Sequence, residues 1–166
     1  MGICIHPSRL HRTLWPLIGV FVLLLTAWPN QQVSAQALGV TYQNAINLGG
    51  GCYRLTNASS SQRGAVWYFG TVDVSQSWEM TADVYLGTNN SGADGMVFVL
   101  RDLGAPTLGG GGGLMGYGGT GFTAAIEPSV AVQMDTYQGL ANHADPNYDH
   151  LAISATASWT TTTQKS

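Results

Sequence analysis

Between residues 129 and 137 the sequence reads Ser-Val-Ala-Val-Gln-Met-Asp-Thr-Tyr, with Val or Met at positions 130, 132 and 134. Side chains two positions apart on a β-strand point to the same side. These three apolar side chains therefore share one face, and Gln133, Asp135 and Tyr137 share the other. The alternation predicts a β-strand with one apolar and one polar face.

Further strands are expected on both sides of this segment. Residues 78–86 alternate in the same way, which is typical of a half-buried antiparallel strand, and residues 95–100 form a continuous apolar run that suits a strand buried on both faces. Shorter candidates are residues 53–56, 64–69 and 150–155. Turn-forming residues lie between the candidates and helical periodicity is hard to find, so the spacing predicts an all-β sandwich or barrel.

The composition supports this fold class. Charged residues make up 9% of the chain, against about 25% in an average globular protein, and there are 22 glycines. Basic residues are few and scattered, which argues against nucleic-acid binding. A glycine-rich run covers residues 108–121, but Leu114, Met115 and Tyr117 interrupt it. These apolar anchors favour a shaped loop over a flexible linker.

The first 35 residues, 1–35, are typical of a secretory signal peptide. Arg9 and Arg12 precede an apolar run from Leu14 to Trp28, and Val33-Ser34-Ala35 forms a small-x-small cleavage site. The run is shorter than the ~20 apolar residues that cross a bilayer. We therefore expect cleavage, and no stable membrane span in the protein that remains.

Removal of this leader affects the rest of the chain. We expect a secreted protein, at the cell surface or in the periplasm, with one domain at residues 36–158 and a disordered tail at residues 159–166. The formal net charge changes from −3 to −5, because two arginines and no acidic residues are lost. Cys4 leaves with the leader, so Cys52 is expected to be a buried structural thiol without a disulfide partner.

Three blocks of sequence, taken in order, resemble the L-type (legume-type) lectin domain in its bacterial form. They are GADGMVFVL at 92–100, GGGGGLMGYGG at 109–119, and VAVQMDTY at 130–137 followed by DPNYDHLAI at 145–153. The resemblance covers about residues 41–155. It implies a concanavalin A-like jelly roll of two antiparallel sheets, with loops at one end that bind a sugar beside two metal ions.

The resemblance also assigns residues to carbohydrate binding. Asp94 matches the family's sugar-binding aspartate, whose carboxylate accepts hydrogen bonds from two sugar hydroxyls. The peptide bond between Ala93 and Asp94 is cis in the family. Gly113 matches a glycine whose backbone N–H meets a sugar oxygen, where the missing Cβ permits close approach. The alternative for Asp94 is a turn residue that caps a strand.

A metal pair is implied in the same way. Asp135 and Asp145 match carboxylates that bridge Ca²⁺ and a transition metal such as Mn²⁺. The backbone carbonyl of Tyr137 matches a Ca²⁺ ligand, and His150 matches a ligand of the transition metal. Oxygen-rich ligation suits Ca²⁺, and an imidazole suits a transition metal. Taken alone, His150 would be read as a histidine at a strand edge.

The sequence departs from the family pattern at the metal site. Gln133 replaces a glutamate ligand, which removes one negative charge and weakens the transition-metal site. Gly139 replaces an asparagine that ligates Ca²⁺ and contacts the sugar. The loop from Tyr137 to Asp145 is one residue longer than the common pattern, and Asn142 in this loop is the candidate to supply the missing amide.

These observations favour a secreted, Ca²⁺-dependent, non-catalytic carbohydrate-binding domain. One alternative is a structural or adhesive surface domain that keeps the scaffold with degraded metal and sugar sites. A glycoside hydrolase is disfavoured, because Glu79 and Glu127 lie in unrelated segments and no clustered acid pair is visible. The matching region ends near Ile153, so the sandwich is expected to be incomplete at its C-terminus, with a downstream segment or a partner chain completing it.

Overall fold

The computed structural model describes residues 1–6, 39–68, 70–102, 104–139, 145–155 and 162–163. Their backbone forms antiparallel strands and one short 3-10 turn, η1. The elements are β1 (Gly2–His6), β2 (Gly39–Gln43), β3 (Ile46–Gly49), β4 (Cys52–Arg54), β5 (Gly64–Tyr68), β6 (Thr81–Tyr85), β7 (Gly95–Arg101), η1 (Gly112–Leu114), β8 (Ser129–Asp135), β9 (His150–Ala155) and β10 (Thr162–Thr163).

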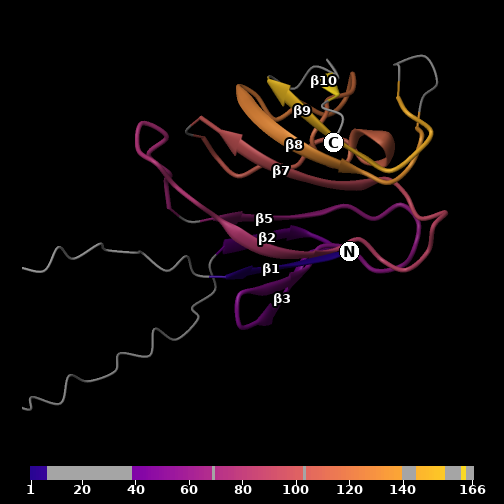
Figure 1. Ribbon diagram of the computed structural model, residues 1–166, viewed down its shortest axis with the longest axis horizontal. Coiled ribbons are helices and arrows are strands. Elements are labelled where there is room, and N and C mark those ends of the chain that lie inside the picture. The colour runs from indigo at the N-terminus through magenta and orange to yellow at the C-terminus, as the bar shows by residue number, and fades with distance from the viewer. Residues whose placement is uncertain (7–38, 69, 103, 140–144, 156–161, 164–166) are drawn as a thin grey trace, which may run out of the picture.

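The strands build a two-layer sandwich (Figure 1). One layer is a four-stranded sheet in the order β10-β9-β8-β7. The other layer contains a four-stranded sheet in the order β3-β4-β1-β6 together with the β2-β5 pair. Every pairing is antiparallel. The predicted all-β antiparallel sandwich is therefore confirmed.

Strand β8 lies in the middle of its sheet and pairs along its length with β7 and β9. Its alternating pattern is confirmed, but the more buried face is the polar one: Gln133 and Asp135 are 4% and 8% exposed, whereas Val130 is 48% exposed. The reason is that the segment between β7 and β8 covers the polar face. Tyr117 and Ile126 from that segment pack on Ala131.

The glycine-rich run is a folded loop, as the sequence predicts. Its backbone closes on itself through hydrogen bonds from the Gly109 N–H to the Gly116 carbonyl (2.6 Å) and from the Gly110 N–H to the Gly118 carbonyl (2.8 Å). A Cβ at Gly109 would clash with the backbone of Tyr117, so this close approach requires glycine. The Tyr117 hydroxyl lies 3.0 Å from the Ser129 hydroxyl, which fixes the loop on β8.

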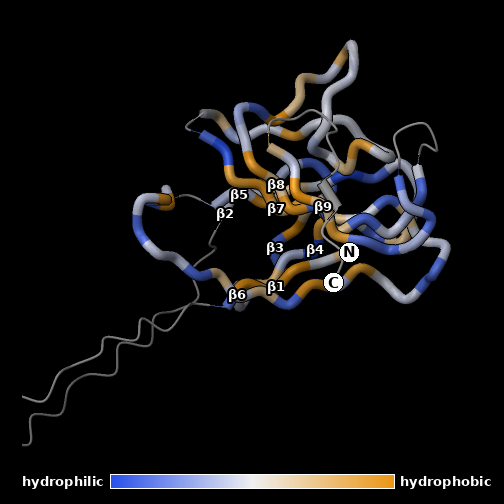
Figure 2. Tube along the Cα trace, turned by 45° about the horizontal axis from the view of Figure 1, so that its top comes forward, coloured by the Kyte–Doolittle hydropathy of each residue, from blue (hydrophilic) through white to orange (hydrophobic). Residues whose placement is uncertain are grey.

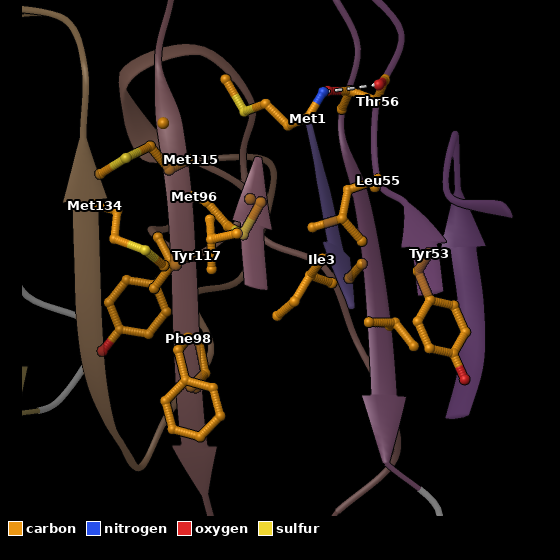
Figure 3. A pocket seen from close by; sticks show the side chains of 18 of the residues that line it. Met1, Ile3, Tyr53, Leu55, Thr56, Met96, Phe98, Met115, Tyr117 and Met134 are labelled. Atoms are coloured by element: carbon orange, nitrogen blue, oxygen red, sulfur yellow. Dashed lines mark hydrogen bonds between the residues drawn. The ribbon is translucent and has the colours of Figure 1, made fainter. Parts of the chain in front are cut away.

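The space between the two layers is only partly filled. It is a cavity of about 2830 Å³. Figure 3 shows Ile3 and Leu55 on one side of it and Met96 and Phe98 on the other. Single ligand pockets measure roughly 300–1,000 Å³, so we interpret this volume as the open interior of the sandwich and not as a ligand pocket.

The sheet that contains β6 is thinly covered. The sequence predicts a half-buried strand over residues 78–86, and the structure has a shorter strand in which Val84 and Tyr85 are 40% and 58% exposed. Figure 2 shows hydrophobic residues along β1 and β6, as well as along β7, β8 and β9. Val84 and Tyr85 of β6 both line the cavity between the two layers, as do Met96 and Phe98 of β7.

Strand β1 occupies an interior position between β4 and β6. Cys4 of β1 is joined to Cys52 of β4 by a disulfide. This corrects the expectation of an unpaired Cys52 for the full chain, because the two cysteines face each other in the antiparallel register. The N-terminal ammonium donates a hydrogen bond to the Thr56 carbonyl at 3.0 Å (Figure 3). Removal of the leader is a processing event and stays a prediction.

The C-terminal segment and the search for membrane-spanning helices give two further results. Within residues 159–166, Thr162–Thr163 pair with β9, so part of the segment expected to be a tail extends the sheet. None of the described segments forms a helix with the length and apolar character that crossing a bilayer requires.

Candidate functional site

Three potential ligand side chains meet at one end of the β8–β9 pair. Asp135 ends β8 and His150 begins β9, and these two residues lie directly opposite each other in the ladder. Asp145 comes from the connection between the two strands. One ligand atom from each of Asp135, Asp145 and His150 lies within 4.8 Å of the other two. The backbone pairing therefore fixes two members of the cluster, and the connection supplies the third.

The orientation of His150 leaves one ring nitrogen free to act as a ligand. Its Nδ1 lies 3.1 Å from the Tyr148 carbonyl oxygen. A carbonyl oxygen only accepts hydrogen bonds, so Nδ1 is the donor in this contact, which leaves Nε2 as the ring nitrogen that faces the carboxylates. Nε2 lies 3.9 Å from Asp145 Oδ1, and the side chains of His150 and Asp145 are 8% and 15% exposed. Metal-binding histidines are commonly oriented by such a bond from the second nitrogen.

Asp135 lies in an environment that disfavours its negative charge. Burial raises the pKa of its carboxyl, and the negative charges of Asp145 and Asp94 raise the pKa further. The Tyr137 N–H, which donates to Asp135 Oδ1 at 2.9 Å, and the nearby His150 lower it. A buried carboxylate with carboxylate neighbours is stabilised by a bound cation.

Asp145 is held toward the cluster by the backbone around it. The Gly139 N–H donates to Asp145 Oδ2 at 2.7 Å, and the Gln138 side-chain amide donates to the Asp145 carbonyl at 3.1 Å. The same turn reaches the glycine-rich loop, because a Cβ at Gly139 would lie 3.8 Å from both Asp145 Oδ2 and Gly113 Cα. Gly113 of η1 is therefore a neighbour of the acidic cluster, although the two segments are far apart in sequence.

Asp94 joins the site from the start of β7. Its carbonyl accepts a hydrogen bond from the Thr136 N–H at 3.0 Å, and the next residue, Gly95, lies opposite Asp135. The Ala93–Asp94 peptide bond is cis, as the resemblance implies. Burial raises the pKa of the Asp94 carboxyl. Asp94 thus lies beside the cluster, with its carboxyl partly withdrawn from water.

The structure gathers most of the predicted site residues at this end of the sheet. Asp94, Gly113, Asp135, Tyr137, Asp145 and His150 all belong to this group. Gln133 lies one pleat further along the same face of β8, where its amide donates to the Ser154 hydroxyl at 2.9 Å. Whether Gln133 ligates a metal stays a prediction. Asn142 lies outside the described residues.

Several supporting residues were not predicted. The Tyr148 carbonyl orients His150, and the Ser154 hydroxyl accepts a hydrogen bond from Gln133. Gly139, expected only to lack a ligand side chain, donates its backbone N–H to Asp145. These contacts depend on strand register and on turn geometry. The nearest signal in the sequence is that Ser154 and Gln133 lie on predicted neighbouring strands.

The donor set fits a divalent metal site. One buried carboxylate, one half-buried carboxylate and an imidazole are the ligand types of Ca²⁺ and of Mn²⁺-like ions. The N–H groups of Tyr137 and Gly139 hold one oxygen of each carboxylate, Asp135 Oδ1 and Asp145 Oδ2. The cluster therefore offers the donor types that a cation takes, beside a partly buried aspartate.

Comparison with known proteins agrees with this geometry. The model of the legume lectin beta-barrel domain matches residues 30–166, most of the chain, and includes every site residue described above. No solved structure matches the chain. The protein therefore belongs to the legume (L-type) lectin domain family. Domains of this family are associated with carbohydrate binding, generally bind metal ions and are generally non-catalytic.

Proposed function

We propose that this protein is an exported, Ca²⁺-dependent carbohydrate-binding domain that leaves its ligand chemically unchanged. The observation that carries the proposal is the meeting of Asp94 with the Asp135, Asp145 and His150 cluster at one end of the sheet. Export is supported by the leader-like sequence of residues 1–35.

Ca²⁺ would be held by the carboxylates of Asp135 and Asp145 together with the Tyr137 carbonyl, and a transition metal by His150 and the same carboxylates. A bound cation supplies fixed positive charge that offsets the mutual repulsion of the carboxylates. Without it, the turn that carries Asp145 is held by the hydrogen bonds from Gly139 and Gln138. We therefore expect metal binding to reinforce the contacts of Gln138 and Gly139 with Asp145.

The sugar would be recognised by hydrogen bonds. The Asp94 carboxylate accepts from two neighbouring hydroxyls, and such charge-assisted bonds fix the orientation of the ring. The region of Gly113 is open, because a Cβ built there meets no atom within 4 Å. A sugar oxygen can therefore approach the Gly113 N–H directly, next to the turn at Gly139.

The test is a glycan array probed with the purified protein in Ca²⁺, in EDTA, and again after Ca²⁺ is restored. The proposal predicts binding that EDTA abolishes and Ca²⁺ recovers. An Asp94→Ala variant should lose binding and keep its melting temperature. Asp149→Ala is the matched control, because Asp149 is an exposed aspartate of the same connection outside the cluster.

Two other outcomes would redirect the assignment. Binding that survives EDTA would place the sugar in a metal-independent site. A folded protein that binds no glycan and no Ca²⁺ would favour a structural or adhesive scaffold, the alternative supported by the absence of a side chain at Gly139.

A further inference from the structure

Strand β1 joins β4 and β6 into one sheet, because it pairs with both of them and they do not pair with each other. Three residues of β1, Gly2 to Cys4, pair with β4, and all five residues of the strand pair with β6. Strands β4 and β6 are not neighbours of each other, and β1 is the only strand paired with β6 among the described residues. We call the place between β4 and β6 the acceptor position.

The strand in this position has an unusual origin. It comes from the first six residues of a leader-like segment, ahead of the apolar run from Leu14 to Trp28. The match to the lectin domain begins only at residue 30, whereas β4 and β6 both lie inside it. The family domain therefore supplies both edges of the acceptor position, and a segment outside the domain fills it.

Loss of β1 would expose those edges. Leader cleavage near Ala35 removes Gly2–His6 from the covalent chain of the domain. Among the strands that the structure describes, β6 would then have no partner, and β4 would lose one of its two partners. Unpaired N–H and C=O groups along a strand form a template for an added strand. Buried backbone groups without partners are also rare in native proteins.

The contacts of β1 define what fits. Ile3 and Ile5 lie two positions apart on one face and line the cavity between the layers, where Ile3 looks toward Met96 and Phe98 (Figure 3). Cys4 points to the opposite face, where it bonds to Cys52. The pattern is two apolar residues separated by a small residue.

The polar contacts add a preference at the end of the strand. The His6 Nε2 lies 2.9 Å from Asp83 Oδ2 of β6. Both groups are exposed, so this pair contributes selectivity and little affinity. A side chain that donates a hydrogen bond, directly after the second apolar residue, is therefore favoured in any strand that occupies the same place.

The present occupant leaves one buried group unsatisfied. Tyr53 of β4, which lies opposite Ile3, is 1% exposed, and its hydroxyl has no hydrogen-bond partner among the described residues. Native proteins rarely leave such a group unpaired, because it costs roughly 1–3 kcal/mol. An apolar residue in the place of Ile3 contacts Tyr53 by packing alone, so this position does not distinguish one apolar occupant from another.

We propose that the acceptor position is a strand-binding site, which takes an extended segment of a partner polypeptide with apolar residues at alternate positions followed by a hydrogen-bond donor. The segment binds by β-strand addition: its backbone pairs with β4 and β6, and its two apolar side chains enter the cavity. A cysteine between them can be joined to Cys52 by thiol–disulfide exchange: the thiolate of one cysteine attacks the other cysteine held as a mixed disulfide with glutathione, and glutathione leaves as its thiol. This inference does not rest on carbohydrate binding.

The test uses the full chain with a protease site inserted after Ala35. The folded protein is cut at this site, and the N-terminal piece stays attached through the Cys4–Cys52 disulfide. Reduction releases the piece. A dye-labelled hexapeptide, Met-Gly-Ile-Cys-Ile-His, is then added in a glutathione buffer, and its mixed disulfide with Cys52 is measured by mass spectrometry. The control peptide carries Ile3→Asn and Ile5→Asn and keeps the same cysteine.

We expect the native-pattern peptide to be trapped at least about tenfold more than the control, because only its side chains gain from burial in the cavity. Hydrogen exchange is the second measurement: the peptide should restore protection to β4 and β6 amides, with those of β7 and β8 as the reference. Equal trapping of the two peptides would show only a reactive thiol and would overturn the proposal. The proposal would also fail if the amides of β4 and β6 stayed protected after the N-terminal piece was released. It would fail as well if their protection was lost and the peptide did not restore it.

Discussion

Gly95 lies directly opposite Asp135 in the β7–β8 ladder, immediately after the aspartate proposed to bind sugar. Its φ is 140°, and a Cβ atom there would collide with the carbonyl oxygen of Met134. The close approach of the two strands at this point sets the distance between Asp94 and the acidic cluster. A residue without a side chain is therefore needed to build the site.

The first prediction concerns this glycine. Gly95→Ala should destabilise the protein by about 3 kcal/mol, because the residue would combine a disfavoured φ with a backbone clash. Gly121→Ala is the control, since a Cβ there meets no atom within 4 Å, and it should change stability by less than about 0.5 kcal/mol. Denaturant unfolding of both variants measures the difference. Equal stabilities would mean that the strands can separate at Gly95 without penalty.

The second prediction concerns Ca²⁺ and stability. Ca²⁺ at about a hundred times its dissociation constant should stabilise the protein by about 2.7 kcal/mol, and EDTA should remove this gain. Asp145→Asn should lose most of the Ca²⁺-dependent rise in melting temperature, whereas Asp149→Asn, outside the cluster, should keep it. A melting temperature that Ca²⁺ leaves unchanged in the wild-type protein would contradict the metal assignment.

A third prediction follows from the raised pKa values of Asp94 and Asp135. A carboxyl whose pKa is higher in the folded state contributes stability that is fully present below the ordinary aspartate value of 3.8 and lost as the pH rises through the folded pKa. The comparison is between the wild-type protein and the double variant Asp94→Asn/Asp135→Asn, both in EDTA. The melting temperature of the wild type minus that of the variant should fall as the pH rises from about 4 to about 7. Ca²⁺ should remove this trend. A difference that grows in the opposite direction would show that the carboxylates are stabilised without metal.

A fourth prediction restores the missing side chain in the turn. A Cβ at Gly139 would make only ordinary contacts with Asp145 and Gly113, so Gly139→Asn fits without rearrangement. The added amide oxygen should strengthen Ca²⁺ binding by about tenfold, or about 1.4 kcal/mol. Isothermal titration with Ca²⁺ measures the change, with Gly139→Ala as the control for the added bulk. Identical affinities of the two variants would mean that the amide does not reach the metal.

The strands that bear the site were the most predictable part of the fold. Alternation or continuous apolar character located β7, β8 and β9 to within a residue or two, because side chains facing a second layer or a loop keep the two-residue period. Strands β2 and β3 were missed, since they are short and lack a clear period. Strand β1 was missed because its residues were assigned to a leader.

The site was predicted less evenly. Parity along one strand placed Asp135 and Tyr137 on the same side, and the contact from the Tyr137 N–H to Asp135 agrees with it. The grouping of Asp94 with Asp145 came from the resemblance alone, because no spacing rule connects the start of one strand with a loop 51 residues later (145 − 94). Which face of β8 is buried also could not be read from the sequence, since it depends on where the glycine-rich loop packs.

The pairing of Asp135 with His150 places two of the three proposed metal ligands on the strands, apart from the segment proposed to choose the sugar. Both residues are fixed by the β8–β9 ladder, and only Asp145 comes from the segment that joins the strands. Insertions or exchanges elsewhere in that segment would leave the strand-borne pair in place. A domain built in this way can diversify its recognition by rewriting one connection, and that connection is the natural target for selecting new glycan preferences in a display library.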